Sequence, residues 1–243
     1  MQGNDVKIKL NCDMGESFGI WKMGLDEEIM PYIHLANLAC GFHASDAMTM
    51  NKSVILAKKY NVIIGAHPAY QDLVGFGRRT MICSLEEIKS IVLYQLGALS
   101  AFCKAHGTGV SYVKPHGALY NDMMRDENIF KAVLNAISSF NKNIKLMVIS
   151  GPKNEEYEYT AKLYDIKLLF EVFADRNYKD DGSWEKYIEM LVARTAYIHG
   201  LLRMRTDGDD LSSIYVKFKD ILDCLDFSFE ERINWKRSYL LPE

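Results

Sequence analysis

The chain has 243 residues and a net charge of −3, with basic and acidic residues interspersed along it. That length suits a single domain over residues 1–243 with a sizeable core, and the absence of a Lys/Arg cluster argues against a broad nucleic-acid surface. The chain has five cysteines, and this odd number without CxxC spacing favours reduced thiols. No stretch is long enough to span a bilayer and no apolar signal core opens the chain, so we expect a cytoplasmic protein.

Six short hydrophobic segments are predicted as strands, and a seventh is weaker. In chain order they cover residues 7–13, 35–41, 62–67, 110–116, 145–150 and 168–174, with the weaker segment at 213–218. Helical patterns fill the intervals, over residues 46–60, 84–105, 121–139 and 154–164. Asp46 is placed to cap the first of these helices, and Ser84 followed by Glu87 is a capping-box pattern at the second. Alternating strands and helices indicate a parallel sheet.

Polar side chains stand where these strands end. The set comprises Asp13, Glu16, His43, Asp46, His67, Lys114, His116, Glu171 and Asp175. The carboxyl ends of parallel strands lie on one face, so these residues should converge in one cavity, with the three histidines in a single pocket. Catalytic groups after nearly every strand favour a (β/α) barrel of about seven strands over an open sheet, whose site sits at one switch point. We therefore predict an enzyme with an α/β barrel fold.

Seven of these residues are the candidate catalytic groups: Asp13, Glu16, His43, Asp46, His67, Lys114 and His116. Two carboxylates in one pocket can divide into a base and an orienting group. Lys114 and His116 alternate, so in a strand they point to the same side, where they can stabilise an oxyanion or phosphate and transfer a proton. For Asp46, helix capping and catalysis are both open interpretations.

The candidate substrate-binding residues are Arg78, Arg79, Glu171 and Asp175. Adjacent arginines in the loop GFGRR can pair with a carboxylate or phosphate, although two arginines are often only a solvated face. Glu171 lies inside an apolar strand and needs a partner, for which Lys114 is a candidate. Asp13, His43 and His67 are candidate ligands of a divalent metal, but the chain has no HxxxH or HExxH spacing, so a bound metal is an alternative interpretation.

Six strings follow one another between Lys7 and Ser183: KIKLNCDMGESFGIWKMG, NLACGFHASD, GAHPAYQDLVGFGRR, YQLGALSAFCKAHG, VKPHGALYN and EVFADRNYKDDGS. In this order they resemble the LamB/YcsF family. The resemblance implies a barrel related to the glycoside hydrolase/deacetylase superfamily. It also implies a component like the A subunit of 5-oxoprolinase, an enzyme that opens the lactam ring of 5-oxo-L-proline to L-glutamate with ATP and Mg and with B and C subunits as partners. No P-loop pattern is visible, so a Walker-type ATP site is not expected.

The chain departs from the family pattern in two places. Where the family usually reads DLGEG, CGFHAGD and AHPGYPD, Ser17, Ser45 and Ala69 stand for glycine and Gln71 for proline. Among these, Ala69 is expected to strain a position with positive φ. From about residue 184 the chain diverges, and the family's closing HGD is absent. Two alternative functions therefore stay open: a non-catalytic assembly subunit and a metal-dependent deacetylase-like hydrolase.

Overall fold

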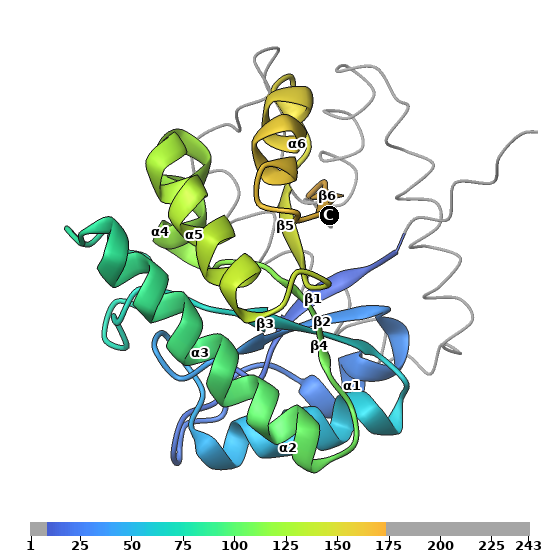
Figure 1. Cartoon of the computed structure of the whole chain (residues 1–243). Coiled ribbons are helices and arrows are strands. Elements are labelled where there is room, and N and C mark those ends of the chain that lie inside the picture. Colours follow the sequence, from blue (N-terminus) through green and yellow to red (C-terminus); the bar gives the residue numbers. More distant parts are fainter. Residues whose placement is uncertain (1–8, 174–243) are drawn as a thin grey trace, which may run out of the picture. The chain divides into compact units, whose positions relative to one another are not determined.

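The computed structural model describes residues 9–173 of the chain (Figure 1). Asp175, the weaker strand predicted at 213–218 and the divergent segment from about residue 184 lie outside the described residues. Compact units are formed by Met1–Glu171 and by Val172–Glu243. The first unit carries every element described below, and the expected single domain stays a prediction.

Six strands form one sheet, and every neighbouring pair is parallel. They are β1 (Asn11–Met14), β2 (Leu35–Ala39), β3 (Ile63–His67), β4 (Val110–Val113), β5 (Lys145–Ile149) and β6 (Leu168–Glu171). The spatial order β1-β2-β3-β4-β5-β6 repeats the chain order. A doubly wound sheet would reverse direction at a switch point, whereas a barrel adds each strand beside the last. The barrel-type α/β fold predicted from the sequence is thus confirmed.

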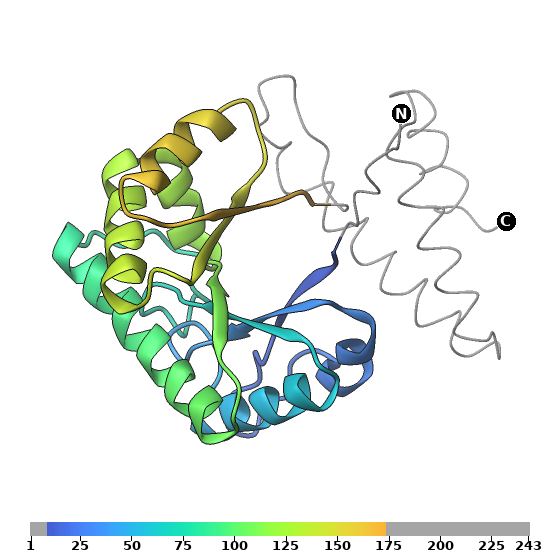
Figure 2. The same ribbon diagram turned by 45° about the vertical axis from the view of Figure 1, so that its right-hand side comes forward.

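The sheet is strongly curled, as a contact between side chains of its two outermost strands shows. Asn11 Nδ2 in β1 donates to Glu171 Oε2 in β6 at 3.4 Å. In a flat sheet, five inter-strand spacings would hold these strands about 24 Å apart. Figure 2 shows the resulting half-barrel, with its strands curving around an inner space and the helices on the outside. The sheet therefore directs side chains from β1, β4 and β6 toward one another.

The helices follow the strands as expected from the alternating pattern. They are α1 (Asp26–Ile29), the 3₁₀ helix η1 (Met30–Tyr32), α2 (Ala47–Lys59), α3 (Leu85–Ala105), α4 (Gly117–Arg125), α5 (Glu127–Phe140) and α6 (Asn154–Lys162). Asp46 caps α2 by accepting from Met48 N and Thr49 N. Ser84 and Glu87 form the predicted capping box of α3. None of the helices in the described part is long and apolar enough to cross a membrane.

Two expectations about local structure were wrong. The helix predicted over 121–139 is two helices, α4 and α5, because Asp126 between them is extended at φ −119° and ψ 113°. Its carboxylate accepts from Asn128 N and thereby caps α5, a local bond that competes with a continuous helix. The strand predicted through residue 116 ends at Val113, although Lys114 N and His116 N still donate to Ala66 O and Pro68 O.

The core lies between the sheet and its outer helices. Leu96 and Leu99 of α3 and Val133 of α5 are fully buried, as are Leu38 of β2 and Val113 of β4. Parallel strands that are buried on both faces read as continuous hydrophobic runs, as β2 does with all five of its residues buried. The opposite side of the sheet faces the inside of the curl and carries buried polar residues together with an apolar cluster of Leu35, Tyr112 and Met147.

Candidate active site

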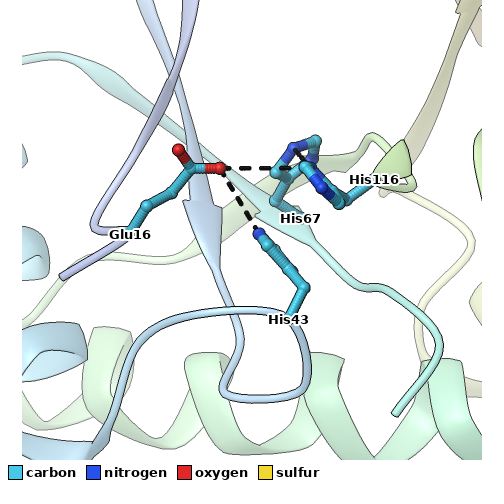
Figure 3. Close-up of side chains that lie close together, drawn as sticks. All are labelled: Glu16, His43, His67 and His116. Atoms are coloured by element: carbon cyan, nitrogen blue, oxygen red, sulfur yellow. Dashed lines mark hydrogen bonds and ion pairs between the residues drawn. The ribbon is translucent and has the colours of Figure 1, made fainter. Parts of the chain in front are cut away.

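Four side chains from four different strand ends converge at the carboxyl edge of the sheet (Figure 3). Glu16, His43, His67 and His116 each offer one ligand atom, and all four atoms lie within 4.8 Å of one another. The three histidines are only 1%, 1% and 4% exposed. The expectation that these histidines share one pocket is confirmed. We call these four residues the histidine cluster.

Two backbone carbonyls orient two rings of the histidine cluster. His67 Nδ1 lies 2.6 Å from Lys114 O, and His116 Nε2 lies 2.9 Å from Phe76 O. A carbonyl oxygen only accepts, so these two ring nitrogens carry the protons. The remaining nitrogens, His67 Nε2 and His116 Nδ1, are then unprotonated in the neutral rings. They face each other at 3.0 Å.

The third ring, His43, is packed rather than hydrogen-bonded. It stacks on His116 with centroids 3.8 Å apart and an interplanar angle of 4°. Within residues 9–173, neither of its ring nitrogens has a hydrogen-bond partner, and Nε2 lies 3.4 Å from Glu16 Oε1. Burial, with a further contribution from His67, lowers the pKa of His43 well below its usual value and that of His116 to about 2. Both rings are therefore neutral at pH 7.

A glycine allows the loop after β3 to close against these rings. Gly77 has φ +63°, and a Cβ on it would lie 2.8 Å from His43 Cβ and 2.9 Å from His116 Cδ2. The loop is therefore in direct contact with the cluster only because residue 77 has no side chain.

A buried ionic network adjoins the histidine cluster. Lys114 Nζ lies 3.1 Å from Asp13 Oδ1 and 3.2 Å from Glu171 Oε2, which confirms the predicted Lys114–Glu171 pair. Desolvation alone would lower the pKa of Lys114, but the two carboxylates outweigh it and raise that pKa. Desolvation alone would likewise raise the pKa of Asp13, but His67 and Lys114 hold it well below its usual value. Asp13 thus stays ionised, with Oδ2 3.5 Å from His67 Nε2.

Sequence reasoning missed two residues that support this network. Asn37 is fully buried in β2, and its Nδ2 donates to Asp13 Oδ1 and to Asn11 Oδ1, both at 2.8 Å. Tyr112 donates to Asn37 Oδ1 at 2.5 Å. The Tyr112 ring occupies the space where a side chain on Gly65 would be, since a Cβ there would lie 2.2 Å from it. An asparagine within the apolar segment HLANLA was the signal that could have identified the site.

Asp46, a candidate catalytic residue, lies outside the histidine cluster. Its Oδ1 accepts from Met48 N and Thr49 N, and its Oδ2 accepts from Gly19 N at 2.7 Å. These backbone bonds, the one from Gly19 first, lower the pKa of Asp46. The capping interpretation is thereby confirmed, and the carboxylate also holds the loop after β1. A catalytic role for it stays a prediction.

The two candidate arginines are differently placed. Arg79 pairs with the buried carboxylate of Asp72 through two nitrogens, so its fork is used within the protein. Arg78 lies over the Phe76 ring, 5.7 Å from its centroid. Burial raises the pKa of Glu16, and the charge of Arg78 offsets part of this rise. Arg78 is therefore the arginine whose charge reaches the cluster, and substrate binding by either arginine stays a prediction.

The group of potential metal ligands in the structure differs in its carboxylate from the set expected from the sequence, and the ligand set itself stays a prediction. His43 and His67 belong to the histidine cluster, but the carboxylate grouped with them is Glu16 rather than Asp13, and His116 is the further member. Asp13 lies beside the group, and its Oδ1 is used by Lys114 and Asn37. Glu16 is three residues farther along the chain, where the turn at Gly15, with φ +71°, directs it to the cluster.

The positive φ angle that was expected at Ala69 is found at Ser45 instead. Ala69 does not have positive φ, whereas Ser45 does, at +75°. Ser45 is 1% exposed in the loop that carries His43. Of the three residues that replace the family's glycines, Ser45 is thus the one in a left-handed conformation.

The chemistry available here is proton transfer, binding of a cation and stabilisation of charge. Comparison with known proteins identifies the family of the chain. A model of the LamB/YcsF family matches residues 8–200. The 5-oxoprolinase A subunit from Vibrio vulnificus (strain YJ016) is 58% identical over 179 residues, covering 74% of this chain and 72% of that protein. The 5-oxoprolinase A subunit 3 from Pseudomonas aeruginosa is 56% identical over 182 residues, covering 75% and 72%.

A solved structure agrees with these sequence matches. The lactam utilization protein from Thermus thermophilus superimposes with a TM-score of 0.69 at 42% identity, over 82% of this chain and 81% of that one. The family model, the sequence matches and the fold agree, and the chain therefore belongs to the LamB/YcsF family.

Proposed function

We propose that the chain is the A component of an ATP-dependent 5-oxoprolinase that opens the lactam ring of 5-oxo-L-proline to L-glutamate. The observation that carries the proposal is the convergence of Glu16 and three histidines beside the Lys114–Asp13 pair at the carboxyl ends of the strands. Its relatives are named as A subunits of 5-oxoprolinase, which supports the substrate and the involvement of B and C subunits. Action in the cytoplasm is part of the same proposal.

ATP is needed because amide resonance and the stability of a five-membered ring oppose hydrolysis. In the proposed reaction the lactam oxygen attacks the γ-phosphorus of Mg-ATP, the phosphoanhydride bond breaks and ADP leaves. Water adds to the activated ring carbon, the C–N bond breaks, and its electron pair stays on nitrogen, which takes a proton. The ring-opened product is an acyl phosphate, and a second water cleaves its C–O–P linkage to give glutamate and inorganic phosphate.

The residues divide into groups that hold charge and groups that exchange protons. Lys114 is neutralised by two carboxylates, so its main effect is to keep Asp13 ionised and oriented. Asp13 is then suited to orient the attacking water. Arg78 is exposed and close enough to act on Glu16, and a guanidinium suits the carboxylate of the substrate. Substrate contacts by Arg79, Glu171 and Asp175 belong to the same proposal, although Arg79 also pairs with Asp72, Glu171 also pairs with Lys114, and Asp175 lies outside the described residues.

A second candidate function is a metal-dependent hydrolase that acts alone, and the histidine cluster is the observation that favours it. One assay separates the candidates: release of glutamate and ADP from 5-oxoproline and Mg-ATP, with and without the B and C subunits. The first proposal expects release only with ATP and the partners present. Glutamate without either would favour the lone hydrolase. A complex that forms but never releases glutamate would favour an assembly role.

Variants connect the assay to the site. His67→Gln removes a ring of the cluster and should lower turnover by about 100-fold or more. The matched control is His106→Gln. His106 is the C-cap residue of α3, its Nε2 lies 2.7 Å from Asn51 Oδ1, and it takes no part in the cluster. Equal losses in the two variants would contradict the assignment of the site.

A further inference from the structure

We propose that Glu16, His43, His67 and His116 together bind one divalent transition-metal ion, with zinc as the best fit. Imidazole nitrogens with one carboxylate are a ligand set that suits zinc, and four ligands complete its tetrahedral preference. The proposal deepens the proposed function but does not require it, because metal binding can be measured without substrate, ATP or partner subunits.

The first argument is the direction of the lone pairs. Backbone carbonyls fix the protons of His67 on Nδ1 and of His116 on Nε2. When both rings are neutral, two unprotonated nitrogens face each other at 3.0 Å with no hydrogen between them. Such a contact is repulsive unless a cation lies near both. Metal-binding histidines typically donate their other ring N–H to a backbone carbonyl in this way, which orients the ring and fixes its tautomer.

The second argument is the third ring. His43 is 1% exposed, and neither ring nitrogen has a hydrogen-bond partner within the described residues. Its Nε2 is directed at Glu16, as Figure 3 shows, at a distance of 3.4 Å from Oε1. A proton shared by His67 and His116 would relieve only their own contact. A metal ion would also give His43 and Glu16 a partner.

The third argument is the spacing of the ligand atoms. Bonds of about 2.0–2.1 Å in a tetrahedron place ligand atoms about 3.3 Å apart. The separations here are 3.0 Å for His67–His116, 3.4 Å for His43–Glu16 and 4.0 Å for His116–Glu16. All four ligand atoms lie within 4.8 Å of one another, so binding needs a contraction, to which Glu16 can contribute because its side chain is 21% exposed and lies in the loop after β1. His43 and His116 are stacked in nearly parallel planes, so one of these rings must also turn for both of their nitrogens to face a single ion.

With a metal in place, the roles at the site separate. The histidines become ligands, and proton transfer falls to Asp13, which lies next to the cluster but is held by Lys114 and Asn37. This division also explains why two carboxylates follow β1: Glu16 is directed to the metal site, and Asp13 is directed to the lysine.

The test is metal content and affinity of the full chain. Protein freed of metal with a chelator is titrated with Zn²⁺ or Co²⁺, and bound metal is measured by elemental analysis and by the visible spectrum of Co²⁺. We expect one ion per chain, a tetrahedral Co²⁺ spectrum that Zn²⁺ abolishes, and affinity lowered about 100-fold or more in His67→Gln and His116→Gln. His106→Gln serves as the matched control and should bind normally.

Folding of the variants is followed by circular dichroism, so that loss of metal is separated from loss of structure. If a histidine variant is unfolded, Glu16→Gln provides the second test, because Glu16 is the most exposed member and its loss should weaken affinity without removing a buried ring. No stoichiometric binding by the folded wild-type chain would overturn the proposal. Binding that is unchanged in all three cluster variants would overturn it as well, since the ion would then lie elsewhere.

Discussion

Removing the buried cation Lys114 tests the ionic network most directly. Its Nζ lies 3.2 Å from Glu171 Oε2, a separation that corresponds to about 5 kcal/mol of gross attraction at an effective dielectric constant of about 20. Desolvation offsets much of this, but deleting one partner leaves a buried charge unpaired and typically costs about 3–5 kcal/mol. The Glu171 side chain is 3% exposed, whereas that of Asp13 is 39% exposed and can be rehydrated. We therefore expect Lys114→Met to cost about 3 kcal/mol, nearly all through Glu171.

The measurement is urea unfolding of the full chain at pH 7, followed by circular dichroism. Glu171→Gln alone should cost about 1–2 kcal/mol, because Lys114 keeps Asp13 as a partner. The double variant should cost at least about 1 kcal/mol less than the sum of the two single variants. Lys142→Met is the matched control, since its pair with Asp165 is exposed on both sides and should contribute little to stability. Additive effects, or a cost below about 1 kcal/mol for Lys114→Met, would refute the reasoning.

Three further predictions concern the loops around the site. In urea unfolding, Ser45→Gly should stabilise the chain by about 0.5–1 kcal/mol, because φ is +75° at this residue. Ala69→Gly should destabilise the chain by a similar amount. A change of stability in the same direction in both variants would contradict this reasoning. Gly77→Ala should cost about 2 kcal/mol by the same measurement, since its Cβ would meet His43 at 2.8 Å; an unchanged midpoint would argue against this contact. Hydrogen bonds from Arg79 lower the pKa of Asp72 from 3.8 to about 2. The stability that this depressed pKa contributes is present above about pH 4 and is lost as the pH falls toward 2. Asp72→Asn should therefore be less stable than the wild type at pH 7, and its free energy of unfolding should change less between pH 4 and pH 2.

Much of the fold and part of the site followed from the sequence, because both depend on local pattern. Alternating hydrophobic strands and helices allow few arrangements, and parallel strands place their carboxyl ends on one face. The convergence of the three histidines followed from that rule alone. Caps at Asp46 and Ser84 followed from side-chain chemistry within four residues. The Lys114–Glu171 pair followed from the need of a buried carboxylate for a cation.

The tertiary structure decided what depends on the path of each loop. Asp13 and Glu16 are equally plausible partners of the histidines by sequence, and only the turn at Gly15 places Glu16 in the cluster. The tautomers of His67 and His116 depend on carbonyls 47 and 40 residues away in the chain. Hydrophobic periodicity carries no information about such contacts. The sequence by itself therefore determined which strand ends meet, and the tertiary structure decided which atoms face each other there, because loop direction and side-chain packing are set by contacts between residues far apart in the chain.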